Sequence, residues 1–166
     1  IVQGMKYLED RMIIHRDLCA RNILVDGKHR AKIGDFSNAI YGVKVKERLA
    51  RAPIRYLAPE VFSLSIYSFK SDIWSFGVVV WEVFHNARVP YDGDDPKKLR
   101  DFINSGNRLQ CLSNRFPAHL WEICTLCWNS NPDERPDCQQ IIDRMKNSVH
   151  EDRGFFRTLS RGLFPV

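Results

Sequence analysis

Apolar residues recur every three to four positions along the first dozen residues of the chain. The apolar positions there are residues 1, 5, 8 and 12. This spacing predicts one helical stripe, and no capping residue precedes it, so residue 1 reads as the middle of a helix. The same kind of spacing predicts three later helices, over residues 94–103, 117–128 and 137–149.

The stretch from Ser71 to Phe84 is apolar on nearly every side. A helix that is hydrophobic all round is normally buried, so this one is predicted to form the centre of the fold. Ser71 or Asp72 is the expected N-terminal cap, because short polar side chains accept hydrogen bonds from the first free N–H groups of a helix.

Two short apolar segments flank the turn signal Asp26-Gly27. Residues 23–25 precede it and residues 31–33 follow it, which predicts a small β-hairpin. Leu24 and Val25 are expected to be strand core. Residues 38–52 show neither helical nor strand periodicity and are predicted to be a loop. The pattern as a whole favours a mainly helical fold carrying one hairpin, without internal repeats.

Polar residues gather at the ends of this predicted hairpin. The cluster His15-Arg16-Asp17 comes before it, Asn22 lies at its start and Asp35 directly follows it. These side chains can therefore converge on one loop surface. A single aspartate would indicate little, but the combination at this spacing has few accidental matches.

The stretch from His15 to Asn22 resembles the protein-kinase catalytic loop, H-R-D-L-x-x-x-N. Asp17-Leu18-Cys19-Ala20-Arg21-Asn22 is similar to the tyrosine-kinase form D-L-A-A-R-N, whereas serine/threonine kinases usually have Lys-Pro after Asp-Leu. The resemblance extends to about residue 148. It implies a mainly α, protein-kinase-like C-lobe over residues 1–149, followed by a C-terminal tail, residues 150–166.

The resemblance also implies a role for each polar residue. Asp17 would accept the proton of the substrate hydroxyl, with Arg21 beside it. Asn22 and Asp35 would hold Mg²⁺ against the phosphates of ATP, and Mg²⁺ favours such oxygen ligands. Leu24 would lie beneath the adenine ring. The alternative is that Asp17 and Asp35 are ordinary loop acids.

Other positions are expected to support the site. His15 is interpreted as a core histidine, and Arg16 either receives a phosphate from the following loop or balances the neighbouring acid. The resemblance implies that Asp72 bonds back to the catalytic-loop backbone. It also implies a buried ion pair between Arg135 and Glu60, which is costly to break from one side.

Three features depart from the family pattern. Ser37 replaces the glycine of Asp-Phe-Gly, and we expect a cost of about 1 kcal/mol or a restricted loop, because glycine tolerates more backbone conformations. Residues 53–56, Pro-Ile-Arg-Tyr, resemble the peptide-binding platform of tyrosine kinases, in which Tyr56 replaces the usual tryptophan. Tyr41, in a segment shorter than usual, is either a phosphorylation site or simply an exposed or packed tyrosine.

Composition narrows the function classes. The chain has 166 residues, 44% hydrophobic and 27% charged, with a net charge of +5, as in a globular domain. Basic residues are dispersed apart from a cluster at residues 44–51, so no nucleic-acid partner is expected. That cluster is a solvated loop or a face for an acidic or phosphorylated partner. The longest apolar run, residues 78–84, is too short for a membrane segment.

Cysteine usage indicates the compartment. Five cysteines at irregular spacing suit a reducing, cytoplasmic location rather than a disulfide framework. The location could equally be the cytoplasmic part of a membrane receptor. Cys124 and Cys127 have the spacing of half a zinc site, but the second half is missing and core cysteines are the favoured interpretation.

The expected function is therefore transfer of the ATP γ-phosphoryl group to a tyrosine of a protein substrate. The alternative is a catalytically inactive pseudokinase lobe that serves as an interaction scaffold. The glycine-rich loop, strand lysine and helix glutamate of the family have no counterpart in this sequence. We therefore expect the 166-residue chain by itself to show no ATP turnover above that of an Asp17→Asn variant.

Overall fold

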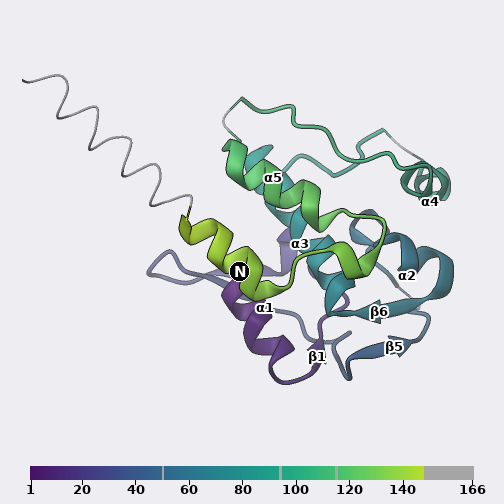
Figure 1. Ribbon diagram of the computed structural model, residues 1–166, viewed down its shortest axis with the longest axis horizontal. Coiled ribbons are helices and arrows are strands. Elements are labelled where there is room, and N and C mark those ends of the chain that lie inside the picture. Colours follow the sequence, from purple (N-terminus) through teal and green to yellow (C-terminus); the bar gives the residue numbers. More distant parts are fainter. Residues whose placement is uncertain (50, 94, 115, 148–166) are drawn as a thin grey trace, which may run out of the picture.

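Helix α3 (Phe69–Phe84) runs through the middle of the fold, and the other elements are arranged around it (Figure 1). The computed structural model describes residues 1–49, 51–93, 95–114 and 116–147. Every residue from Ser71 to Trp81 is buried, as the all-round apolar pattern predicts. The helix thus serves as the common packing partner for segments distant in the sequence.

The start of α3 differs from the prediction. The N-cap is Ser68, three residues before the first of the two expected caps, and Ser71 instead accepts a hydrogen bond from the Ser68 N–H at 3.0 Å. The helix therefore begins at Phe69, and Asp72 is free to bond elsewhere. The missed turn, Phe69-Lys70, follows a short strand whose pairing partner lies far back in the chain, so no local signal marks this boundary.

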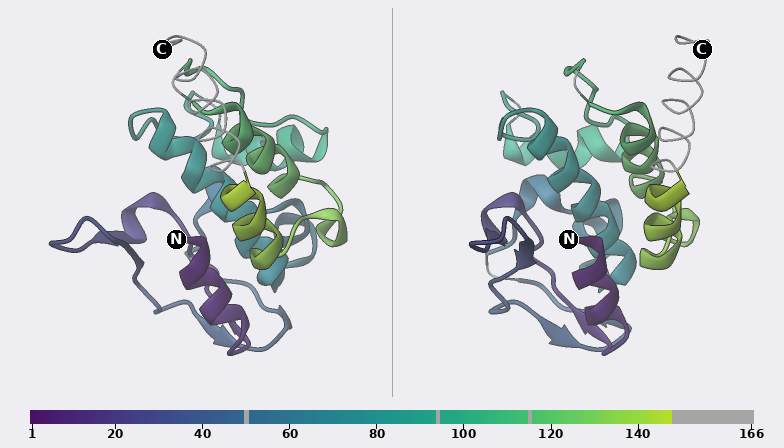
Figure 2. Two further views of the ribbon diagram at one scale, coloured as in Figure 1. Left: turned by 60° about the vertical axis from the view of Figure 1, so that its left-hand side comes forward. Right: turned by 90° about the vertical axis from the view of Figure 1, so that its left-hand side faces the viewer.

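Further helices lie around α3, and one of them, α5 (Ala118–Cys127), packs directly against it (Figures 1 and 2). The others are α1 (Val2–Glu9), α2 (Pro59–Leu64) and α4 (Pro96–Asn104). Residues 138–147 are also helical, and three short 3₁₀ helices occur at Ala20–Asn22, Ile54–Tyr56 and Pro132–Glu134. The mainly helical fold class is confirmed. None of the described helices combines the length and apolarity needed to cross a membrane.

The strands of the described residues form three antiparallel pairs. They are β1 (Ile13–Ile14) with β4 (Ile40–Tyr41), β2 (Ile23–Val25) with β3 (Ala31–Ile33), and β5 (Lys44–Lys46) with β6 (Ile66–Ser68). The pair β2–β3 confirms the predicted hairpin. The interpretation of residues 38–52 as loop throughout is wrong, because β4 and β5 lie within it. Their partners are distant in the sequence, so local periodicity could not reveal them.

Leu24 and Val25 are not strand core. Their exposed fractions are 59% and 66%, because hairpin β2–β3 projects from the helical body (Figure 2). The prediction of core packing for these two residues is therefore wrong. An exposed apolar strand remains compatible with a ligand-facing surface. Val149 and the predicted tail, residues 150–166, lie outside the described residues.

Close packing between α3 and the C-terminal end of α5 requires a glycine. A Cβ at Gly77 would lie 2.7 Å from Trp128 Nε1 and 3.0 Å from Cys127 Cβ. We expect Gly77→Ala to lower the free energy of unfolding by about 1–2 kcal/mol, since overpacking outweighs the better helix propensity of alanine. Urea unfolding would measure this.

Gly27→Ala is the matched control, because a Cβ there would have nothing within 4 Å. Its effect should stay within about 0.5 kcal/mol. Equal stability of the two variants would contradict the packing argument.

Candidate active site

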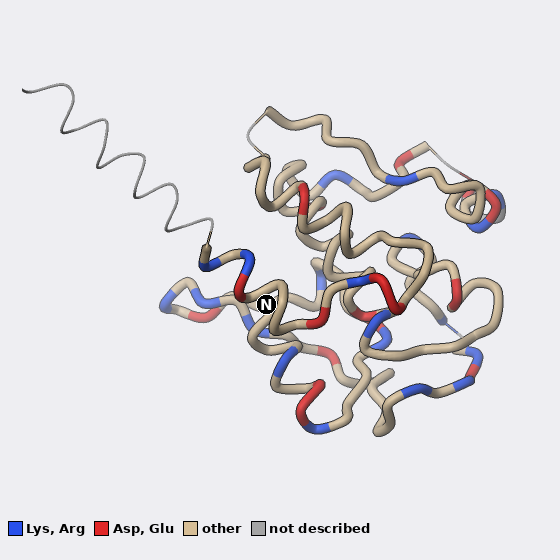
Figure 3. Tube along the Cα trace, viewed as in Figure 1, with Lys and Arg blue, Asp and Glu red and all other residues tan. Residues whose placement is uncertain are grey.

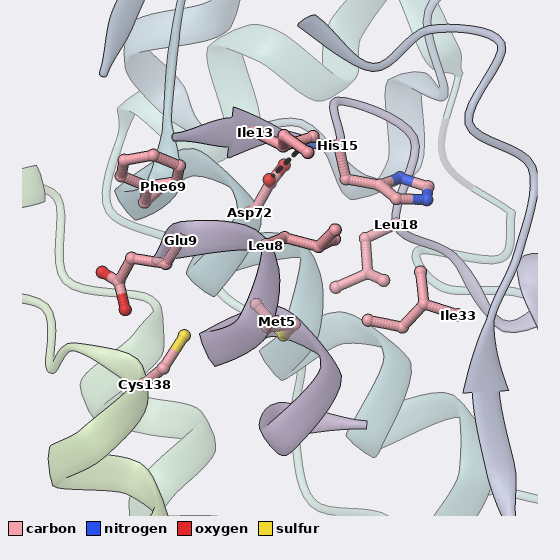
Figure 4. Close-up of a pocket in the computed structure, with 10 residues that line it drawn as sticks. All are labelled: Met5, Leu8, Glu9, Ile13, His15, Leu18, Ile33, Phe69, Asp72 and Cys138. Carbon is pink, nitrogen blue, oxygen red and sulfur yellow. Dashed lines mark hydrogen bonds between the residues drawn. The ribbon is translucent and has the colours of Figure 1, made fainter. Parts of the chain in front are cut away.

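The backbone of the His15-Arg16 stretch is fixed by the buried helix α3. Asp72 accepts hydrogen bonds from the N–H of His15 at 2.7 Å and the N–H of Arg16 at 3.0 Å, and Figure 4 shows the first. The predicted role of Asp72 is thus confirmed. Burial raises the pKa of Asp72 to about 6, since the lost hydration outweighs the two N–H groups.

His15 joins this loop to the strand end beyond the hairpin. Its side chain is buried, and Nε2 lies 3.0 Å from the carbonyl oxygen of Gly34. Nδ1 accepts the N–H of Asp17 at 3.3 Å, so Nε2 is the nitrogen that donates. The ring also meets the edge of Phe36. His15 therefore has the surroundings of a structural core histidine, as predicted.

Asp17 is almost buried, and donors hold both of its carboxylate oxygens. Arg21 Nη2 donates to Oδ1 at 2.7 Å, and Asn38 Nδ2 donates to Oδ2 at 3.3 Å. The thiol of Cys19 also lies 3.5 Å from Oδ1. Each oxygen of the carboxylate thus has a donor that orients it. Sequence reasoning anticipated the contact with Arg21 and missed those of Asn38 and Cys19.

Asn22 lies directly before β2 and links the loop at Asp17 to the end of β3 by two hydrogen bonds. Its side-chain Nδ2 donates to the carbonyl oxygen of Asp17 at 2.8 Å, and its backbone carbonyl accepts the N–H of Gly34 at 2.8 Å. These bonds leave the side-chain oxygen of Asn22 as an acceptor. Asp35 follows Gly34 directly, so the loop and the end of β3 converge as the sequence pattern predicts.

Comparison with known proteins identifies the family that this loop belongs to. Residues 1–145 match the family model described as protein tyrosine and serine/threonine kinase. The chain belongs to this kinase family. It is 35% identical over 157 residues to tyrosine-protein kinase SYK of Gallus gallus and 39% identical over 153 residues to the leukocyte tyrosine kinase receptor of Mus musculus.

Tyrosine-protein kinase ZAP-70 of Mus musculus is 36% identical over 152 residues. These three matches cover 91%, 88% and 89% of this chain, but the matched parts are only 25%, 17% and 24% of the three relatives. The three relatives are tyrosine kinases by name, which confirms the tyrosine-kinase resemblance. The chain corresponds to part of the kinase catalytic domain.

Asp35 has an unusual backbone in this kinase lobe. Its φ is +55°, in the left-handed region, and Arg16 has a φ of +65°. Such conformations cost about 1–3 kcal/mol each and often persist at functional sites. Ser37 is not among the described residues with positive φ. The expected strain at Ser37 is therefore absent in this conformation, because the left-handed turn falls at Asp35 instead.

Ser37 has a direct contact with Asp35. Its hydroxyl donates to Asp35 Oδ1 at 2.7 Å, and its backbone N–H lies 3.3 Å from the same oxygen. These two bonds lower the pKa of Asp35, the hydroxyl contributing most. The carboxylate thus stays ionised to lower pH than an ordinary aspartate, and it is exposed to solvent.

Ser37→Ala should raise the pKa of Asp35 back toward its ordinary value, because the stronger of the two bonds is lost. NMR titration of the side-chain carboxyl carbon would measure this shift. Asp26 is an internal control, since its lowered pKa depends first on Arg30 rather than on Ser37. An unchanged pKa at Asp35 would contradict the role given to the hydroxyl.

The donor set of this site suits a hard cation. Asn22 offers an amide oxygen and Asp35 an ionised, exposed carboxylate. Mg²⁺ usually takes one or two protein oxygens and fills its remaining positions with phosphate oxygens and water, so these two residues fit. Within the described ranges, no group of three or more His, Cys, Asp or Glu could hold a metal ion.

The thiols of Cys124 and Cys127 are buried in α5. Burial raises the pKa of both thiols, to about 12 for Cys124, which opposes the thiolate that zinc requires. Packing within the core therefore accounts for them.

A small, partly open cavity lies beside the catalytic loop (Figure 4). It measures about 10 Å³, and its lining includes Met5, Leu8 and Asp72. This volume corresponds to one water molecule, far below that of a nucleotide pocket. The cavity is therefore not a nucleotide site. Leu24, predicted to lie beneath the adenine ring, is on the exposed hairpin and does not line this cavity. Its Cδ1 lies 3.1 Å from the position that a Cβ on Gly34 would take.

Proposed function

We propose that this chain is the catalytic lobe of a protein tyrosine kinase and transfers the γ-phosphoryl group of ATP to tyrosine in a protein substrate. The observation that carries the proposal is the orientation of Asp17. Arg21 and Asn38 hold its carboxylate, and Asn22 bonds to its backbone carbonyl. Phosphoryl transfer depends on such positioning more than on covalent chemistry by the protein.

Each residue has one role in this proposal. Asp17 orients the tyrosine hydroxyl and accepts its proton as the tyrosine O–P bond forms and the bond from the γ-phosphorus to ADP breaks. Arg21 donates a hydrogen bond to the Asp17 carboxylate and orients it. Asn22 and Asp35 would hold Mg²⁺, which neutralises phosphate charge when bound. Leu24 offers an exposed apolar surface for the adenine ring.

The peptide-binding platform also has a defined support. Arg55 donates to the carbonyl of Pro90 at 2.9 Å, the hydroxyl of Tyr56 donates to Glu82, and the carbonyl of Tyr56 accepts the hydroxyl of Ser75 at 2.8 Å. Tyr56 is thus anchored to α3 from both its side chain and its backbone. Tyrosine therefore fills the place where the family usually has tryptophan.

A cytoplasmic location fits the state of the cysteines. All five are free thiols, and four of them are buried. Free thiols are usual where the environment is reducing. The same location supplies the ATP that the proposed reaction consumes.

Nucleotide binding by the full-length gene product tests the proposal against the scaffold alternative. We expect ATP to bind only with Mg²⁺, and Asp35→Asn to weaken this binding, because a neutral amide is a poorer ligand. Asp26→Asn, at the tip of the hairpin, is the matched control and should bind normally. Absence of Mg²⁺-dependent binding, together with a protein partner that survives Asp17→Asn, would favour the scaffold instead.

A further inference from the structure

The guanidinium of Arg16 is buried and bonds to two later residues, Asn38 and Glu47. Its side chain is 6% exposed, Nε donates to the carbonyl oxygen of Asn38 at 2.6 Å, and Nη1 donates to Glu47 Oε2 at 2.6 Å. The guanidinium carbon also lies 5.5 Å from the ring centre of Tyr67. Arg16 thus pairs with Glu47. The prediction that Arg16 balances Asp17 is wrong, because Asp17 pairs with Arg21.

Glu47 has a special position in the sequence. It is the only acidic residue between Asp35 and Glu60, and basic residues surround it. These are Lys44, Lys46, Arg48 and Arg51. Figure 3, in the view of Figure 1, shows basic positions along and next to β5. No other side chain of this segment carries the negative charge that a buried guanidinium requires.

The hydroxyl groups of the same segment are all placed elsewhere. Residues 36–59 contain three of them, at Ser37, Tyr41 and Tyr56. Ser37 donates to Asp35, and Tyr56 donates to Glu82. Tyr41 is 68% exposed, with its hydroxyl 3.8 Å from the sulfur of Met12. The carboxylate of Glu47 therefore occupies the place at Arg16 that a phosphate on this loop would need.

The Arg16–Glu47 pair connects the site to the body of the lobe. Asn38 contacts Asp17 through its side chain and Arg16 through its carbonyl oxygen. The N–H of Glu47 donates to the carbonyl oxygen of Ser65 at 3.0 Å, next to the pairing of β5 with β6. A continuous set of contacts thus runs from Asp17 to Asn38, from Asn38 to Arg16, and from Arg16 to Glu47 beside β6.

We propose that Glu47 is a positioning residue that holds residues 36–49 against the catalytic loop without phosphorylation of that segment. The carboxylate neutralises Arg16, and Arg16 in turn fixes Asn38, whose amide orients Asp17. The expected effect on catalysis rests on the proposed function. The placement of the segment does not depend on it.

Hydrogen–deuterium exchange of the full chain tests the placement. In Glu47→Gln, amides of residues 38–47 should exchange roughly 10-fold faster, the size expected when a hydrogen bond to a charged group is lost. Amides of α3 and α5 should exchange at the wild-type rate. Wild-type protein treated with phosphatase should keep its slow exchange, and Glu47→Asp should restore part of the protection.

Glu122→Gln is the matched control. Glu122 is 69% exposed and its carboxylate lies 4.0 Å from Arg144, so its loss should leave residues 38–47 unchanged. Two results would overturn the proposal. One is equal exchange in Glu47→Gln and Glu122→Gln, and the other is protection of the wild-type segment that disappears after phosphatase treatment.

Kinetics of the full-length gene product test the link to catalysis. Glu47→Gln should raise KM for a tyrosine peptide and lower kcat/KM roughly 10-fold, with KM for ATP within about twofold of wild type. Loss of folded enzyme would lower kcat and move neither KM. Absence of activity in the wild type would refute the proposed function alone, whereas unchanged peptide kinetics in an active Glu47→Gln enzyme would refute this inference.

Discussion

Asp17→Asn in the full-length gene product should lower kcat for tyrosine phosphorylation by about 10²–10⁴-fold, the usual contribution of a general base. The amide oxygen of asparagine can still accept the hydrogen bond from Arg21, whereas its NH2 group cannot accept the N–H of Asn38. Asparagine cannot accept the proton of the substrate hydroxyl. The loss should therefore appear in kcat, with KM for ATP nearly unchanged, and steady-state kinetics with a tyrosine peptide would measure it.

Asp26→Asn is the control for this experiment. Asp26 is also an aspartate paired with an arginine, since Arg30 Nη2 lies 2.8 Å from its carboxylate, but it lies in the hairpin turn. Its substitution should leave kcat within about twofold of wild type. If Asp17→Asn kept a kcat within tenfold of wild type, Asp17 could not be the base.

Glu60→Gln should lower the free energy of unfolding by about 3–5 kcal/mol. Arg135 makes two parallel bonds to Glu60, of 2.7 and 2.8 Å, and its side chain is fully buried. The guanidinium also bonds the carbonyls of Lys70 and Asn129 and stands over the ring of Trp74. The amide would leave this buried charge without its counter-ion, and urea unfolding of the full chain would measure the loss.

Asp101→Asn provides the exposed counterpart. Asp101 pairs with Arg100 at 3.1 Å, and both side chains are more than half exposed. An exposed pair contributes little, so the change should stay within about 0.5 kcal/mol. Similar losses in Glu60→Gln and Asp101→Asn would show that burial does not decide the energetics of the Glu60–Arg135 pair.

The sequence was sufficient for features whose signal is local. The apolar run of α3 implies burial on all sides, and the Asp26-Gly27 turn between two apolar triplets implies a hairpin. The family motif added two distant contacts that spacing alone could not supply. These are Asp72 with the catalytic-loop backbone and Arg135 with Glu60.

Features that depend on distant partners were missed. Strands β4 and β5 are only two and three residues long, so their pairing with β1 and β6 leaves no periodicity. Leu24 carries a strand-core signature but lies on a projecting hairpin. The contacts of Asn38 with Asp17 and of Glu47 with Arg16 arise because the chain folds back across the loop. Such contacts cannot be predicted from a residue type at a fixed sequence spacing.

The most direct measurement is phosphoamino-acid analysis after the full-length gene product reacts with γ-labelled ATP, Mg²⁺ and a random glutamate–tyrosine polymer. The proposed function predicts label on tyrosine in the wild type, and label on tyrosine reduced by about 10²–10⁴-fold in Asp17→Asn. Absence of label on tyrosine in the wild type, or equal labelling in the two proteins, would contradict the assignment of this lobe as a tyrosine kinase with Asp17 as its base.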